Sequence, residues 1–214
     1  MCRLLQNVSV LAMVAHALAS PTAAQGFGGE VRAVVGFPTV NREALATVDR
    51  LTGTAFGLDA GVRFWRLELT VRYLQGPLES SIDQTKSDLV QGTVALQVRP
   101  IDFLTVGIGP QARSYISEGG TERWLAWEGR LGVDTWLLRP ALRSALVLSY
   151  ALGGSVNTGS AFSKGGSIEG RLEARIPRTP LWAAVGYRVE HGSLGANTGT
   201  DTLEEFLLSV AVGR

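Results

Sequence analysis

The sequence has little cysteine, histidine or lysine, and no excess of charge of either sign. Of its 214 residues one is cysteine and two are histidine, and 20 basic residues stand against 19 acidic ones, for a net charge of +1. One cysteine excludes disulfide frameworks and cysteine-rich zinc sites. The charge balance leaves no basic surplus for a nucleic-acid partner. The hydrophobic content of 45% excludes a disordered chain. We therefore expect one folded domain with no metal, no cofactor and no nucleic acid.

The longest apolar stretch lies at the N-terminus and predicts export. Arg3 precedes a mostly apolar stretch over residues 4–19, and small residues at 22–24 suit cleavage by a signal peptidase. The stretch is shorter than the ~20 apolar residues that a membrane-spanning helix needs. We predict a signal peptide over residues 1–24 and one mature domain over residues 25–214.

Apolar and polar residues alternate with period two through the rest of the chain, which predicts β-strands. Four short turns, near residues 65, 100–101, 139–140 and 177–180, alternate with five longer polar links. The predicted strands are 27–37, 54–64, 66–75, 88–99, 102–115, 123–137, 142–153, 166–176, 181–191 and 203–213. The predicted long loops are 38–53, 76–87, 116–122, 154–165 and 192–202.

Short turns that alternate with long loops are the layout of an outer-membrane barrel. A strand of ten or eleven residues, rising ~3.3 Å per residue and tilted by ~40°, spans about 25 Å, the height of the apolar band of such barrels. The mature chain resembles the small bacterial outer-membrane β-barrels. The fold class expected is all-β, a ten-stranded antiparallel up-and-down transmembrane β-barrel, with eight strands as the alternative. The resemblance implies a location in the bacterial outer membrane, contact with its lipid and lipopolysaccharide, and insertion by the barrel-insertion machinery.

The charged residues of the strands fall on one face, which predicts a lumen filled with ion pairs. All the basic residues on this face are arginine, whose planar fork suits paired carboxylates better than a lysine does. Turning this face toward lipid would cost up to about 2–4 kcal/mol per arginine near the bilayer midplane. The predicted network consists of Glu30, Arg32, Asp59, Arg63, Glu68, Arg72, Arg113, Glu128, Arg130, Glu169, Arg171, Glu173, Arg175, Arg188 and Glu190.

Aromatic residues gather near the predicted strand ends, as they do at the two interfaces of a bilayer. One group lies beside the four short turns and the other lies toward the long loops. The predicted membrane girdle consists of Trp65, Phe103, Trp136, Trp182, Tyr73, Tyr150, Tyr187 and Phe206.

The last predicted hairpin brings a histidine, a serine and an acid to one edge. His191, Ser193 and Glu204 share the outward parity of their strands, and a nucleophilic serine needs a base with an orienting acid behind it. The spacing resembles the lipid A 3-O-deacylase family. That resemblance implies Ser193 as the nucleophile, His191 as the general base and Glu204 as the orienting acid, with Asp201 or Glu205 as the alternative acid.

Three functions remain open from the sequence. The first is an outer-membrane barrel with a narrow, charge-filled lumen and a structural or surface-interaction role through its long loops. The second is a serine esterase of the lipid A deacylase type, which acts on lipopolysaccharide from the lipid-facing wall. The third is a soluble exported ligand-binding barrel, which would carry its apolar face inside.

Overall fold

The computed structural model describes residues 27–44, 47–82, 84–157, 162–194 and 199–213. The predicted signal peptide over residues 1–24 lies outside these residues. Among the described residues, no helix has the length and apolar character needed to cross a membrane.

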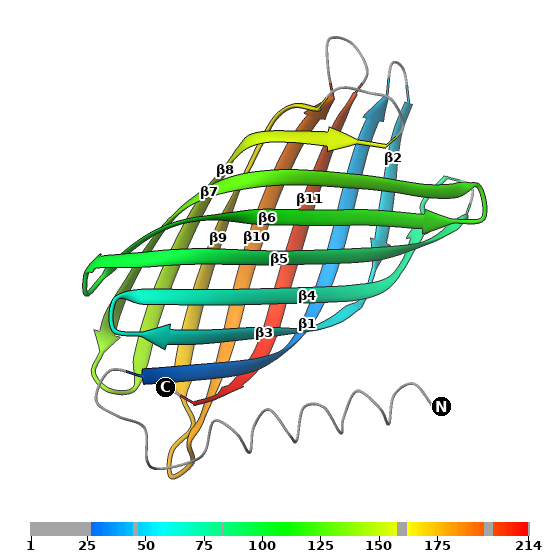
Figure 1. The fold of residues 1–214 in the computed structure, drawn as a ribbon. Helices are drawn as coiled ribbons and strands as arrows, with labels where there is room; N and C mark the ends of the chain where they lie inside the picture. The colour runs from blue at the N-terminus through cyan, green and yellow to red at the C-terminus, as the bar shows by residue number, and fades with distance from the viewer. Residues whose placement is uncertain (1–26, 45–46, 83, 158–161, 195–198, 214) are drawn as a thin grey trace.

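The described residues form one closed antiparallel β-barrel (Figure 1). Its strands are β1 (Phe27–Ala44), β2 (Thr47–Gly53), β3 (Ala55–Phe64), β4 (Leu67–Ser80), β5 (Lys86–Ile101), β6 (Leu104–Ser117), β7 (Gly120–Leu138), β8 (Leu142–Val156), β9 (Phe162–Arg175), β10 (Leu181–Leu194) and β11 (Thr200–Val212). β2 and β3 pair with the same two neighbours, β1 and β4, so they occupy one position in the wall. β1 pairs with β11 and closes the barrel. The prediction of ten strands is confirmed, and the alternative of eight is wrong.

The interruption between β2 and β3 has a local cause. The register of the flanking pairs, Gly53 with Leu78 and Phe56 with Gln75, puts Thr54 across from Pro77 of β4, and proline has no N–H to donate to the ladder. Glycines let the two backbones approach here: a Cβ atom on Gly53 would lie 1.9 Å from the Pro77 carbonyl oxygen, and one on Gly76 would lie 2.1 Å from that of Thr54. The wall therefore bends at this point without losing its register.

The four short turns lie at one end of the barrel, which we call the turn end. They connect the strands at residues 65–66, 102–103, 139–141 and 176–180. The opposite end, which we call the rim end, differs from the prediction. The segments predicted as long loops over residues 38–53 and 76–87 are largely strand, and β6 and β7 are joined by only two residues, 118–119. The long-loop prediction is therefore wrong for most of these residues.

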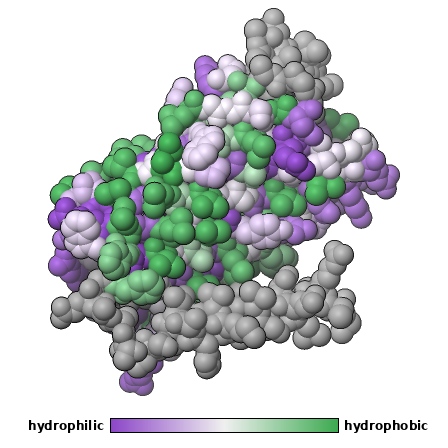
Figure 2. All heavy atoms as spheres, viewed as in Figure 1, coloured by the Kyte–Doolittle hydropathy of each residue, from purple (hydrophilic) through white to green (hydrophobic). Residues whose placement is uncertain are grey.

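An apolar band covers the outer wall of the barrel. Outward side chains such as Leu69, Leu96 and Ile168 are about half exposed, at 46%, 53% and 47%. On the face seen in Figure 2, hydrophobic side chains gather in the middle and hydrophilic ones lie toward the rim end of β6 and β7. Two belts of exposed aromatic side chains bound the band. The turn-end belt contains Phe27, Phe64, Trp65 and Phe103, and the rim-end belt contains Phe37, Phe56, Tyr73, Trp127, Tyr150, Tyr187 and Phe206.

Two tryptophans predicted for the girdle lie inside the barrel. Trp136 has the inward parity of Asp134, and Trp182, 8% exposed, has that of Arg188. Their indole rings contact each other, with centroids 5.9 Å apart. The girdle prediction is therefore wrong for this pair, because proximity to a short turn does not fix which face a side chain takes.

Beyond the rim-end belt the outward face of the wall becomes polar and the inward face becomes largely apolar. Outward residues there are polar, for example Thr39, Asn41 and Thr52, whereas inward residues such as Val40 and Leu51 are apolar and fully or nearly buried. We call this part of the wall the rim. Its strands have the sidedness of a soluble barrel, with apolar side chains inside and polar side chains in water.

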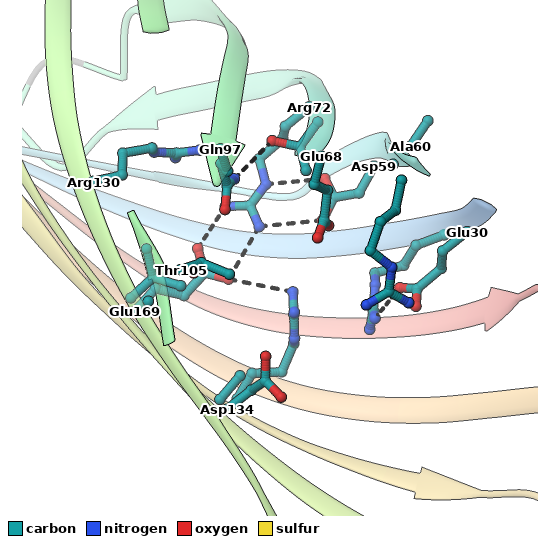
Figure 3. Close-up of a pocket in the computed structure, with 18 of the residues that line it drawn as sticks. Glu30, Asp59, Ala60, Glu68, Arg72, Gln97, Thr105, Arg130, Asp134 and Glu169 are labelled. Atoms are coloured by element: carbon teal, nitrogen blue, oxygen red, sulfur yellow. Dashed lines mark hydrogen bonds and ion pairs between the residues drawn. The ribbon is translucent and has the colours of Figure 1, made fainter. Parts of the chain in front are cut away.

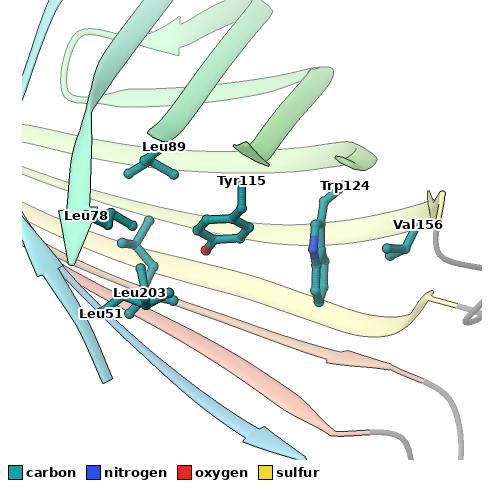
Figure 4. Close-up of a cluster of buried hydrophobic side chains, with 8 residues drawn as sticks. Leu51, Leu78, Leu89, Tyr115, Trp124, Val156 and Leu203 are labelled. Atoms are coloured by element: carbon teal, nitrogen blue, oxygen red, sulfur yellow. The ribbon is translucent and has the colours of Figure 1, made fainter. Parts of the chain in front are cut away.

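The inward apolar side chains of the rim form one cluster, the rim core, which lies across the lumen (Figure 4). Tyr115 and Trp124 are its largest members, and Phe162 packs edge-on against Trp124 with ring centroids 6.1 Å apart. The members are Val40, Leu51, Leu78, Leu89, Tyr115, Trp124, Val156 and Leu203. The rim core closes the rim end of the lumen.

β7 extends beyond its neighbour β8 at the rim, where Trp124 pairs with Val156 at the end of the ladder. Asn157 covers the exposed edge. Its side-chain Oδ1 accepts a hydrogen bond from the Arg123 N–H at 2.7 Å, and its Nδ2 donates to the Thr121 carbonyl at 2.8 Å. The backbone N–H of Asn157 donates to the Arg123 carbonyl at 3.1 Å. The side chain and the backbone of Asn157 thus satisfy three backbone groups of β7 beyond the end of the ladder with β8.

We expect Leu89→Ala to lower the free energy of unfolding by about 2–5 kcal/mol, because Leu89 is fully buried in the rim core and its truncation leaves a cavity. Leu96→Ala, on the outward face of the same strand, is the matched control and should cost much less. Urea unfolding of the refolded barrel, followed by tryptophan fluorescence, measures both. Equal losses for the two variants would contradict a packed rim core.

Candidate functional site

Charged side chains from strands on all sides line and cross the lumen between the turn end and the rim core. At the turn end, Glu173 of β9 is fully buried and binds three guanidinium groups. Arg32 of β1 donates to its Oε1 at 2.7 Å, Arg143 of β8 lies 2.9 Å from its Oε2, and Arg171 lies 2.8 Å from its Oε1. One carboxylate therefore ties β1, β8 and β9 together from inside.

A second set of ion pairs crosses the middle of the lumen (Figure 3). Arg72 of β4 donates to both oxygens of Asp59 on the neighbouring β3, at 2.9 and 3.2 Å. It also donates to both oxygens of Glu169 on β9, at 2.6 and 3.0 Å. Because β4 and β9 are not neighbours in the sheet, this bidentate pair links separate parts of the wall.

A third layer lies directly beneath the rim core. Arg113 pairs with Glu190 at 3.4 Å and with Asp201 at 3.3 Å. Glu190 also pairs with Arg188 and accepts a hydrogen bond from the Gln111 amide at 2.9 Å. The Arg113 guanidinium lies over the indole of Trp124, 5.4 Å from the ring centroid. The charged layer and the rim core are therefore in direct contact.

Two residues of the predicted network take no part in the ion pairs of the described chain. They are Arg63, which lines the cavity at the turn end, and Arg175, which is exposed at the end of β9. Arg42 is a member that the prediction missed, because residues 38–53 were assigned to a loop. It pairs with Glu122 at 3.4 Å and with Asp201 at 3.6 Å. Continued alternation past Pro38 was the signal that could have found it.

A cavity of about 200 Å³ occupies the turn-end half of the lumen. Residues near its turn-end mouth are partly exposed, as with Glu30 at 25% and Glu68 at 24%, so solvent reaches it from that end. Seven arginines and five carboxylates line it, namely Arg32, Arg63, Arg72, Arg99, Arg130, Arg143, Arg171, Glu30, Asp59, Glu68, Asp134 and Glu169.

The predicted catalytic residues each have a different partner. His191 lies opposite Thr202 in the ladder, and its Nδ1 is 3.0 Å from the Thr202 hydroxyl. The Ser193 hydroxyl donates to the Lys164 carbonyl at 3.3 Å. Glu204 accepts a hydrogen bond from the Tyr187 hydroxyl at 2.8 Å. Within the described residues, no hydrogen bond joins His191 to Ser193 or to Glu204.

The two alternative acids lie on the other side of the wall. Asp201 is 3% exposed and pairs with Arg113 in the lumen, and Glu205 is 2% exposed and has the same inward parity. Neither can orient the exposed His191 ring from there. His191 also lies on the rim side of Tyr187, among polar residues, and not on the apolar band. The described geometry therefore does not assemble the predicted relay.

The part of the chain that the structure describes contains no group of three or more histidine, cysteine, aspartate or glutamate side chains placed to hold a metal ion.

No family model and no curated protein matches the chain by sequence. Solved structures do match. The translocator domain of the autotransporter NalP from Neisseria meningitidis aligns with a TM-score of 0.52 and 12% identity, over 96% of this chain and 95% of that one. The chain has the fold of bacterial outer-membrane barrels.

Two further structures share this fold. The outer-membrane protease OmpT from Escherichia coli aligns with a TM-score of 0.54 and 9% identity, over 91% of this chain and 99% of that one. An outer-membrane channel from Pseudomonas putida F1 aligns with a TM-score of 0.53 and 11% identity, over 92% of this chain and all of that one. A translocator, a protease and a channel share the architecture, so the likeness indicates a fold and not an activity.

We expect Glu173→Gln to lower the free energy of unfolding by about 3–5 kcal/mol, because it leaves the buried Arg32 and the partly buried Arg143 and Arg171 without their shared carboxylate. Glu79→Gln, at an exposed position of β4, is the control and should change stability by less than about 0.5 kcal/mol. Urea titration in detergent micelles measures both. A neutral Glu173→Gln would show that the ion pairs around this residue do not support the fold.

Proposed function

We propose that the protein is a closed outer-membrane β-barrel, whose apolar band spans the bilayer and whose rim projects outside it. Its role is structural or surface-interacting, and the rim supplies the contact surface in place of long loops. The observation that carries this proposal is the exchange of sidedness at the rim-end belt. The wall changes there from a surface suited to lipid to one suited to water.

The dimensions of the band support a membrane location. Phe27 and Phe37 mark its two belts on β1 and are ten residues apart. Ten residues rise ~33 Å along a strand, which is about 25 Å along the axis of a barrel tilted by ~40°. Half-exposed leucines and valines between the belts, such as Leu69 and Val94, argue against the soluble binding barrel, which would place them inside.

The obstruction of the lumen at its rim end supports a role other than solute passage. A solute that entered the cavity at the turn end would meet the ion pairs of Arg113 and Glu190 and then the rim core. Small barrels have an interior just wide enough for side chains to fill. The protein is therefore proposed to be closed in its resting state.

The rim presents groups that suit lipopolysaccharide. Arg50, Lys86, Arg123 and Lys164 are exposed and have outward parity just beyond the apolar band. Cations at this level suit the phosphate groups of an anionic outer leaflet. The outward residues of β11, Phe206, Leu208 and Val210, provide the alternating apolar pattern that the insertion machinery is proposed to bind.

We expect Leu69→Arg to lower the stability of the barrel in lipid vesicles by about 2–4 kcal/mol, because it places a charge near the middle of the band. Thr52→Arg introduces the same charge on the exposed rim and should be nearly neutral. Wild-type protein should fractionate with outer membranes and show heat-modifiable gel mobility. Equal stability of the two variants in vesicles, or wild-type protein in the soluble fraction, would contradict the proposal.

We expect the wild-type barrel to give no stable conductance steps in planar bilayers. The double variant Arg113→Ala, Trp124→Ala removes one large side chain from the charged layer and one from the rim core above it. We expect this variant to conduct. Trp127→Ala, an outward residue of the same strand that is 57% exposed, is the control and should stay closed. Steady conductance by the wild type would contradict a closed lumen.

A further inference from the structure

The inner end of the charged cavity contains donors that the ion-pair network leaves unused. Arg130 of β7 has one ion pair, from its buried Nε to the Glu128 Oε2, and its length of 3.6 Å leaves both atoms without a hydrogen bond among the described residues. Its like-charged neighbours are Arg72 and Arg188. A guanidinium beside other guanidiniums, with only a loose carboxylate partner, has capacity to bind a further anion.

A second unused donor lies in the same part of the cavity. Thr93 of β5 is 4% exposed, lines the cavity and has a buried hydroxyl with no partner among the described residues. Thr93 lies opposite Arg72 in the ladder between β4 and β5. Thr93 therefore has the inward parity of Arg72 and lies beside it in the wall.

The wall brings Arg130 and Gln97 together across a residue without a side chain. Gly107 of β6 lies between them, opposite Gln97 on one side and Arg130 on the other. A Cβ atom on Gly107 would lie 2.6 Å from the Gln97 Cγ, so only glycine leaves this space open. In Figure 3 Arg130 extends from its strand toward Gln97 and Arg72. Arg130 of β7 and Gln97 of β5 thus border one open space on the cavity wall.

The electrostatics of the cavity favour an anion. Its seven lining arginines exceed its five lining carboxylates by two. Glu128 and Glu173 would make the numbers of arginines and carboxylates equal, but they do not line the cavity. They are 2% and 0% exposed and are bound by arginines that do line it. Both oxygens of Glu169, one of the lining acids, are already bound by Arg72. The surface that a ligand would meet is therefore positive.

We propose that the inner end of this cavity binds a small tetrahedral oxyanion of the phosphate class, which enters from the turn end. Arg130 supplies the main positive charge and Thr93 supplies a neutral donor, whereas the Gln97 amide already donates to the Thr70 hydroxyl at 3.1 Å. Guanidinium groups suit phosphate oxygens because their N–H donors form a planar fork. A volume of about 200 Å³ holds such an ion with several waters and is smaller than the pockets that take drug-sized ligands.

The test is a calorimetric titration of inorganic phosphate into the refolded full barrel in non-ionic detergent, at constant ionic strength set with sodium chloride. Saturable binding to the wild type is expected. Arg130→Gln should weaken the affinity tenfold or more, because a hydrogen bond to a charged group is lost. Thr93→Val, which has nearly the same shape and keeps every charge, should weaken it by a smaller factor. Arg175→Gln, at an exposed arginine with no described ion pair, should bind as the wild type does.

Heat-modifiable mobility of each variant shows that it is folded before titration. If Arg130→Gln does not fold, Thr93→Val decides the result alone. No saturable binding by the wild type, or equal affinities of the wild type and the decisive variant, would overturn the proposal. A parallel titration with glycerol phosphate distinguishes two sources of the same chemistry: equal affinity indicates a phosphate group on a larger molecule, and weaker affinity indicates the free ion.

Discussion

Closure of the hydrogen-bond ladder between β1 and β11 is the constraint on which the rest of this structure depends. A closed ladder leaves no unpaired edge along the band, so the backbone needs no water there. It also divides every strand into side chains that point inward and side chains that point outward, with no third choice. Paired charges inside and apolar side chains outside are then the stable arrangement wherever lipid surrounds the wall.

The same alternation of inward and outward side chains gives a different distribution of apolar residues beyond the rim-end belt, where water replaces lipid around the wall. The ladder continues without a break in register between Phe37 and Thr39 on β1, yet the preferred face of the apolar residues is reversed. This reversal explains why the strands could be predicted in the band and were missed in the rim. A search for outward apolar residues ends at the belt, and Pro38 and Gly76 resemble loop residues when only the sequence is known. The inward apolar residues Val40, Leu51 and Leu89 also alternate with polar ones, so they indicate strands as clearly as the outward apolar residues of the band do.

The charged residues show how far the sequence could specify a site. Parity alone placed Arg72 and Glu169 on the inward face, but their contact joins β4 to β9 across the lumen and depends on barrel diameter and stagger. The predicted relay at His191 failed for a related reason. Parity placed His191 and Glu204 on one face, whereas the register opposes His191 to Thr202 and Val189 to Glu204. A shift of two residues preserves the face and changes the partner, and alternation cannot detect it.

The hydrogen bonds of Asn157 have a consequence for how copies of this protein meet. A strand that projects beyond its neighbour offers an open row of backbone donors and acceptors, which is a template for adding a strand from another molecule. The side-chain amide of Asn157 occupies part of this row on β7, where it accepts from the Arg123 N–H and donates to the Thr121 carbonyl. In a crowded membrane, where barrels collide continually in one plane, this side chain hinders the pairing of β7 with a strand of a neighbouring barrel.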